Sequence, residues 1–142
     1  MSFFTLDKLR IFSFTTTLSI FILMLLGSYT SSIGAGLACP DWPLCQEITS
    51  FPIFVEFLHR AWSMVTSLFL ILTFVIALKL KGENFKRIKR ISFLLFLVFI
   101  IQIFWGALNI FTGLDPFVVT VHQGLATLSF GLSSILTYLA RS

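Results

Sequence analysis

The sequence predicts an all-α integral membrane protein, a four-helix bundle with up-down topology and both termini in the cytoplasm. Of its 142 residues, 57% are hydrophobic and only 11% are charged, whereas soluble domains carry about 25% charged residues. Segments without a charged side chain cover 11–40, 61–78, 91–114 and 116–140. Because about 20 apolar residues span the hydrocarbon core, we expect one membrane domain, 1–142, with helices near 9–31, 52–79, 91–113 and 116–140.

Each predicted helix has its own local support. The segment 9–31 is too long for a cleaved signal peptide, and no small-residue cleavage site interrupts it before the glycines near position 34. The second and fourth segments begin with Pro52 and Pro116, which suit the first turn of a helix because an N–H there has no helical partner. The third follows the basic stretch KLKGENFKRIKR, 79–90. We expect an external loop at about 32–51 and a cytoplasmic loop at about 80–90.

The basic residues predict the orientation of the chain. Nine of the ten Lys and Arg residues precede the first segment, join the second to the third, or follow the last, and Arg60 is the exception. By the positive-inside rule these nine lie in the cytoplasm. The net charge of +4 therefore indicates orientation in the plasma membrane rather than a surface for nucleic acid.

The two histidines of the sequence have matching positions. His59 lies seven residues after Pro52, and His122 lies six after Pro116. At the helical rise, each is roughly 9–10 Å below its helix start, so we expect both at one depth near the external face, on parallel helices. Two facing imidazoles in a bundle are typical of a bis-histidine haem. Two unrelated histidines that form interhelical hydrogen bonds are the alternative.

Small and polar residues repeat at one spacing in the first and third helices. The matched positions are Gly27, Thr30 and Gly34, and Gly106, Asn109 and Gly113. This pattern indicates two similar helical hairpins. In each, a helix with glycines on one face runs toward the external side, and the antiparallel helix that follows it carries a histidine. It favours a planar ligand between the hairpins, although close packing of helices through small residues is an alternative.

The external loop contains both cysteines, Cys39 and Cys45, in the stretch CPDWPLC. Its two prolines and tryptophan make a stiff turn that could bring the thiols together, and outside the cytoplasm such a pair is expected to be oxidised. A structural staple and a labile disulfide coupled to thiol chemistry both remain open.

Three stretches, GSYTSSIGAGLACPDWPLC, EFLHR and WGALNIFTGLDPFVVTVHQGLATL, together resemble the haem A synthase family. The resemblance covers all four predicted helices. It implies an eight-helix protein of two four-helix halves, each with a histidine pair, one for the substrate haem O and one for a haem B cofactor. The function that it implies is oxidation of a methyl group of haem O to a formyl group, which gives haem A for cytochrome oxidase.

The resemblance also implies roles for individual residues, carried over motif by motif. They are axial ligation of the haem iron by His59 and His122, catalysis by the carboxylate of Glu56, and a loop disulfide between Cys39 and Cys45.

This chain departs from the family pattern in two ways. It is half the length and has one histidine pair, so we expect a homo-oligomer, or a different partner chain, to supply the second haem site. Haem O synthase or oxidase-assembly proteins are possible partners. Where many relatives have a basic residue, this chain has Ser31, which leaves Arg60 as the expected partner of a haem propionate.

The motif EFLHR places three polar side chains at the start of a membrane helix. Glu56 and His59 are three residues apart and share a face, and Arg60 lies next to them near the interface, where it can pair with a propionate. A carboxylate beside the reacting carbon could stabilise positive charge or move protons. The alternative is a self-neutralising Glu56–Arg60 pair at a helix start, which leaves His59 unexplained.

Two other classes of function share these features. A bis-histidine membrane cytochrome b for electron transfer would use the histidine pair but has no need of Glu56. A non-catalytic protein for haem delivery or oxidase assembly would bind haem without altering it.

Overall fold

The computed structural model describes residues 5–39, 41, 43, 45 and 47–142. Over these residues it contains four α-helices and one 3₁₀ turn, and it has no strands. They are α1 (Leu6–Ser32), α2 (Phe51–Lys79), η1 (Glu83–Phe85), α3 (Lys86–Phe111) and α4 (Pro116–Arg141). Each of the long helices is long and apolar enough to cross a membrane, which confirms the predicted all-α membrane fold.

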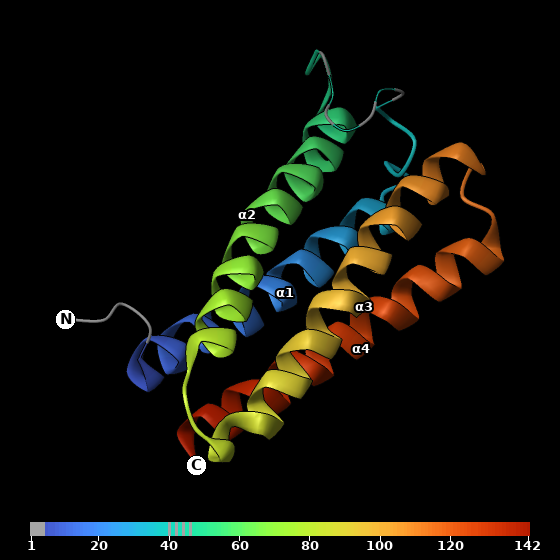
Figure 1. Cartoon of the computed structure of the whole chain (residues 1–142). Helices are drawn as coiled ribbons and strands as arrows, with labels where there is room; N and C mark the ends of the chain where they lie inside the picture. Colours follow the sequence, from blue (N-terminus) through green and yellow to red (C-terminus); the bar gives the residue numbers. More distant parts are fainter. Residues whose placement is uncertain (1–4, 40, 42, 44, 46) are drawn as a thin grey trace.

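Consecutive helices run antiparallel, so α2 and α4 run in the same direction (Figure 1). Each helix packs against the next in the sequence, and α1 also packs against α4. The helices that hold the two histidines, α2 and α4, therefore lie at opposite corners of the bundle. The described residues of the connections 33–50 and 112–115 lie at one end, which we call the loop end. The start of α1, the C-terminus and η1 lie at the other, the basic end (Figure 1).

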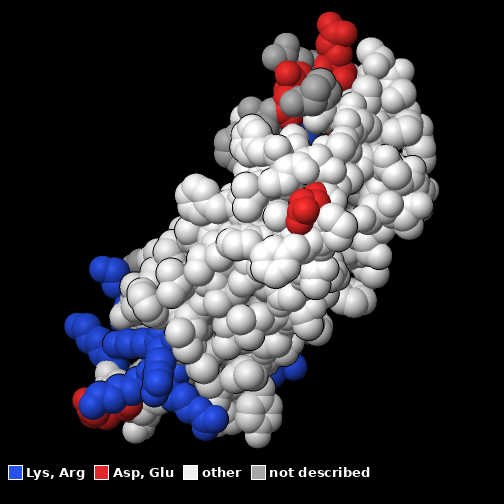
Figure 2. Space-filling view, turned by 90° about the vertical axis from the view of Figure 1, so that its right-hand side faces the viewer, with Lys and Arg blue, Asp and Glu red and all other residues white. Residues whose placement is uncertain are grey.

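Lysine and arginine side chains gather at the basic end (Figure 2). This is the distribution from which the sequence predicts a cytoplasmic location for that end. The orientation itself stays a prediction. It would place the loop end outside the cell.

Local sequence explains where the helices begin. The side chain of Thr5 accepts a hydrogen bond from the N–H of Lys8 at the start of α1, and Asp115 accepts two from the first turn of α4, at 3.0 and 3.2 Å. Such caps satisfy N–H groups that lack a helical partner. The third helix begins at Lys86 rather than near 91, because the basic residues before its apolar segment also adopt helical geometry.

The loop-end termini of α1 and α3 are built alike. Gly34 and Gly113 have φ angles of 70° and 63°, a left-handed conformation that glycine adopts at little cost. The next N–H donates to the carbonyl five residues back, at 2.9 Å in α1 and 2.8 Å in α3. A Cβ atom on either glycine would have no neighbour within 4 Å. These two members of the sequence repeat therefore end helices and do not make room for a ligand.

The half of the bundle nearer the basic end is filled by side chains. Its apolar core includes Leu9, Ile76, Leu95 and Leu136, each at most 1% exposed. Hydroxyl groups join the helices around this core. The pairs are Thr16–Thr73 at 2.8 Å, Ser19–Thr66 at 2.8 Å, Thr17–Ser133 at 2.6 Å and Thr17–Thr137 at 2.9 Å. Hydrogen bonds of this kind hold membrane helices together.

Candidate functional site

A cavity of about 620 Å³ lies in the loop-end half of the bundle. Side chains from α1, α2, α3 and α4 line it, and so do residues of both loop-end connections. Its volume is within the range of roughly 300–1,000 Å³ that is typical of pockets for small molecules and cofactors. The predicted site residues Glu56, His59, Arg60 and His122 all line this cavity.

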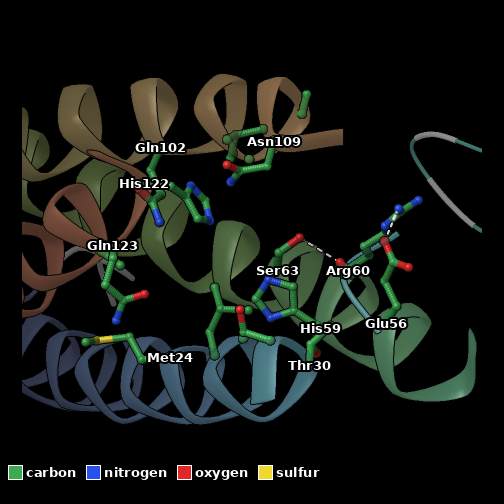
Figure 3. A pocket seen from close by; sticks show the side chains of 18 of the residues that line it. Met24, Thr30, Glu56, His59, Arg60, Ser63, Gln102, Asn109, His122 and Gln123 are labelled. Carbon is green, nitrogen blue, oxygen red and sulfur yellow. Dashed lines mark hydrogen bonds and ion pairs between the residues drawn. The ribbon is translucent and has the colours of Figure 1, made fainter. Parts of the chain in front are cut away.

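The two imidazoles reach into the cavity from opposite corners of the bundle, His59 from α2 and His122 from α4 (Figure 3). Each ring lies against a glycine of the preceding helix. A Cβ atom on Gly27 would be 2.9 Å from Cε1 of His59, and one on Gly106 would be 3.1 Å from Cε1 of His122. The repeat seen in the sequence therefore corresponds to the same ring-on-glycine contact in both hairpins, α1–α2 and α3–α4.

The polar surroundings of the two rings also match. His59 lies beside the backbone carbonyl of Leu23, and His122 lies beside that of Gln102. Both carbonyls belong to the residue four positions before the contacted glycine. Over the described part of the chain, neither Nδ1 atom makes a well-formed hydrogen bond, although both are buried. A metal-binding histidine commonly turns one ring nitrogen to a backbone carbonyl and offers the other to the metal.

These features fit an iron porphyrin. Two imidazoles from diagonal helices match the axial ligation of a haem, and each glycine leaves space that a Cβ atom would fill. No cluster of three or more His, Cys, Asp or Glu side chains occurs among the described residues. Ligation of a metal by the histidine pair stays a prediction.

Glu56 and Arg60 form a buried ion pair on the cavity wall, with side chains 4% and 10% exposed. The second carboxylate oxygen of Glu56 accepts a hydrogen bond from the backbone N–H of Cys39 at 2.7 Å. Arg60 also donates to the carbonyl oxygens of Cys39, at 3.1 Å, and Asp41. The charged pair thus joins α2 to the connection between α1 and α2. The Glu56–Arg60 pair that offered an alternative explanation of EFLHR is present, and Glu56 still lines the cavity.

The guanidinium of Arg60 points at this loop as well as at Glu56 (Figure 3). Its assignment as the partner of a haem propionate stays a prediction. In the loop itself, Cys39 and Cys45 are joined as a disulfide with their Cα atoms 5.5 Å apart, and Cys39 is 1% exposed.

Several cavity-lining polar residues were not predicted as site residues. They are Thr30, Ser63, Gln102, Asn109, Gln123 and Ser129. Helical spacing does not distinguish a cavity wall from a contact between helices. Thr66 and Ser133, for example, bond to neighbouring helices instead. The contact between Glu56 and Cys39 had no signal in the sequence, because it depends on how the loop folds back.

The sequence model of the family described as cytochrome oxidase assembly protein matches residues 46–134. The match includes both histidines, Glu56 and Arg60. The chain belongs to this family. Membership confirms the resemblance from which the sequence predicted a relative of haem A synthase.

Curated members of the cytochrome oxidase assembly family with sequences similar to this one are named haem A synthase. The protein from Exiguobacterium sp. is 30% identical over 132 residues, that from Staphylococcus carnosus 28% over 135, and that from Bacillus pumilus 27% over 137. These alignments cover 92–93% of this chain but only 43–44% of each relative. The chain therefore spans less than half the length of the curated relatives that it matches.

Proposed function

We propose that this chain is a haem A synthase, a haem-dependent oxidoreductase that oxidises the methyl group of haem O to a formyl group and so provides haem A for cytochrome oxidase. One observation carries the proposal. In a chain of this family, imidazoles from diagonal helices lie on matched glycines in a single cavity whose wall also holds the buried carboxylate of Glu56.

His59 and His122 would hold the haem iron, and the cavity would take haem O as substrate or haem B as cofactor. When bound, haem B supplies a redox-active iron. The protein contributes the fixed positions of the two imidazoles, because the glycines behind them allow each ring only a small space. Apolar side chains of α1 and α3, such as Leu23, Ile103 and Ala107, also line the cavity and would contact the apolar faces of a porphyrin.

Glu56 would act as the catalytic carboxylate. It lies three residues before His59, about one helical turn nearer the loop end. Its carboxylate is oriented by Arg60 and by the N–H of Cys39. A negative charge held in a site shielded from water can stabilise positive charge that develops on a substrate. If its contact with Arg60 loosens, the same group can accept a proton.

The first experiment asks whether the two histidines bind haem. The purified protein should show the absorption spectrum of a six-coordinate, low-spin haem, and His59→Ala and His122→Ala should each lose it. A suitable comparison is Glu47→Gln, because Glu47 is exposed and is not one of the two histidines. A spectrum that survives both histidine substitutions would remove the proposed ligand pair.

The second experiment separates the candidate functions. In cells that make haem O, the wild type should produce haem A, and Glu56→Gln should keep the haem spectrum while haem A formation is lost. The matched variant Glu47→Gln should produce haem A normally. If the protein were a cytochrome b, Glu56→Gln would not change its function. If it were a haem-delivery protein, even the wild type would leave the haem O pool unaltered.

The location and partners belong to the same proposal. We place the cavity near the external face of the plasma membrane, since the positive-inside rule puts the basic end in the cytoplasm. A second copy of the chain, haem O synthase and oxidase-assembly proteins stay predicted partners. Haem content per chain, measured together with the mass of the oligomer, tests the first of these.

A further inference from the structure

The side chain of Asn109 on α3 is a buried amide whose oxygen has no hydrogen-bond partner among the described residues. It lines the cavity and is 9% exposed, and it extends from α3 toward the space around the two histidines (Figure 3). Among the residues that the structure describes, its Oδ1 atom is buried without a hydrogen-bond partner. A buried polar atom left unsatisfied destabilises the protein, because it has lost its hydrogen bonds to water. A ligand that completes its hydrogen bonds would remove that destabilisation.

A second amide lies on the same wall. Gln102 lines the cavity, and its Oε1 atom is likewise buried and unpaired within the described part of the chain. At the helical rise, Asn109 is about 4.5 Å from Gly106 toward the loop end, and Gln102 is about 6 Å from it toward the basic end. The two amides therefore flank the glycine on which His122 lies.

The other hairpin shows that the fold does not need these amides. At the matching positions around Gly27, α1 has Leu23 and Thr30. The hydroxyl of Thr30 donates to the carbonyl of Leu26 at 2.8 Å, so its hydrogen bond is made within its own helix. The same ring-on-glycine contact is thus built on α1 with no unsatisfied amide. The amides of α3 are therefore not needed for packing of the helices and are available to bind a ligand in the cavity.

The chemistry of this wall indicates what it binds. A primary amide offers both donors and an acceptor, whereas an ionised carboxylate only accepts. A hydroxyl group can donate to the amide oxygen and accept from its nitrogen at the same time. The charged residues of the cavity wall, Glu56 and Arg60, come from α2 and are paired with each other. The α3 wall is therefore suited to a neutral oxygen-bearing group.

We propose that Asn109, supported by Gln102, is the residue that selects a porphyrin with a hydroxyl-bearing side group over one with a purely hydrocarbon group at that position. The inference rests on the proposed function, in that the cavity must take an iron porphyrin. It adds that one wall of the cavity distinguishes among such porphyrins. A site built to bond a hydroxyl discriminates against an analogue that lacks it, because its own polar groups are then left unpaired.

Two iron porphyrins test this directly. Iron haematoporphyrin carries 1-hydroxyethyl groups where iron mesoporphyrin carries ethyl groups, and both have the same propionates. Each is titrated into the purified, haem-free protein in detergent, and Kd is obtained from the Soret absorbance. Wild type should bind the hydroxylated porphyrin roughly three- to tenfold more tightly, the value of one net hydrogen bond.

Asn109→Thr copies the residue that the fold accepts at position 30. It should bring the ratio of the two Kd values close to one and leave the Kd for iron mesoporphyrin unchanged. Asn109→Leu is a second variant, with the same expected ratio and no hydroxyl. Thr112→Val is the control, because Thr112 directly follows the last residue of α3, lies outside the cavity lining, and has a hydroxyl that donates to the carbonyl of Leu108. It should keep the wild-type ratio.

The outcomes separate the two proposals. If wild type binds both porphyrins equally, or if the Asn109 variants keep the preference, the inference about Asn109 is wrong while the haem site stands. If wild type binds neither porphyrin through its histidines, the proposed function fails. Loss of affinity for both porphyrins by the same factor in both Asn109 variants would assign the residue to packing and would also overturn the inference.

Discussion

The imidazole of His59 lies so close to Gly27 that a methyl group on that glycine would come within 2.9 Å of its Cε1 atom. The contact joins α2 to α1, and His122 makes the corresponding contact from α4 to Gly106 on α3. Since heavy atoms in contact normally stay farther apart, neither position accepts even alanine without movement of the ring or the helix. The glycines thereby determine where the imidazoles stand in the cavity.

We predict that Gly27→Ala weakens haem binding. The added methyl must push the ring of His59 or separate α1 from α2, and overpacking of this kind costs about 1–3 kcal/mol. Gly106→Ala should have a smaller effect, because its nearest contact of 3.1 Å needs a smaller adjustment. Haem titrations of the purified variants, followed by absorbance, measure both effects.

Gly131→Ala on α4 is the matched control. A Cβ atom there has no neighbour within 4 Å, so alanine should leave haem affinity unchanged, and it favours the helix by up to about 1 kcal/mol. Equal losses of affinity in Gly27→Ala and Gly131→Ala would mean that the contact with His59 is not what lowers the affinity.

The helical membrane fold was predictable because its signal is carried by composition along the chain. A segment without charges must be covered by lipid or protein, and a helix satisfies its backbone hydrogen bonds internally. The start of α3 was less predictable. Lys86 to Arg90 are helical, yet an apolar segment locates only the part of a helix inside the hydrocarbon and not its extension into water.

Only the part of the candidate site whose residue positions follow from helical spacing was predictable from the sequence. The positions of His59 and His122 on parallel helices followed from their distances to Pro52 and Pro116. The alignment of Gly27 with Gly106 pointed to the correct pair of small residues, but the same alignment included Gly34 and Gly113, which turn out to end helices. Sequence spacing does not record backbone conformation, and only the φ angles of those glycines separate the two roles.

The part of the site near the loop end could not be predicted because it depends on a loop. The N–H of Cys39 reaches Glu56 across 17 positions of sequence, through a segment with no periodic pattern. The guanidinium of Arg60, which stays the predicted partner of a haem propionate, also donates to carbonyl groups of the loop. Such contacts follow from the path of the backbone and not from residue type.

We predict that Arg60→Met destabilises the protein by about 3–5 kcal/mol, because it leaves the carboxylate of Glu56 buried without its counter-charge. The double variant Glu56→Gln with Arg60→Met should cost less than the sum of the single variants, since the two side chains interact directly. Unfolding in detergent, followed by the loss of helical circular dichroism, gives all four free energies of the cycle.

The exposed pair Asp7–Arg10 is the control for this cycle. Its side chains are 83% and 43% exposed, and surface ion pairs contribute at most about 1 kcal/mol. Asp7→Asn should therefore change the free energy of unfolding little. If Arg60→Met were equally mild, the Glu56–Arg60 pair would not hold the loop to α2 in the way that its hydrogen bonds indicate.

We predict that Cys39 and Cys45 react with a membrane-impermeant maleimide in intact cells only after treatment with a water-soluble phosphine reductant. The reason is that the disulfide blocks both thiols, and the positive-inside rule places the loop end outside the cell. The measurement is the mass of the purified protein after labelling, which gains two labels per chain when the bond is reduced.

A cysteine at the basic end tests the orientation separately. In a chain with Cys39→Ser and Cys45→Ser, the variant Lys81→Cys should stay unlabelled in intact cells and become labelled once the membrane is permeabilised. Labelling of that cysteine from outside would reverse the predicted orientation, and labelling of the wild type before reduction would show that the loop thiols are free.

The hydroxyl pairs of the basic-end half lead to a further prediction, about how the bundle stays closed below the cavity. Thr16 of α1 and Thr73 of α2 lie 2.8 Å apart, and both are at most 1% exposed. Thr73→Val should cost about 0.6 kcal/mol and at most roughly 1.7 kcal/mol, the range for interhelical hydrogen bonds in membranes, as measured by unfolding in detergent. Thr15→Val is the matched control, because that hydroxyl donates at 3.0 Å to the carbonyl of Ile11 in its own helix. An equal cost for both substitutions would mean that the hydroxyls act on their own helices rather than between them, and that apolar packing alone keeps this half closed.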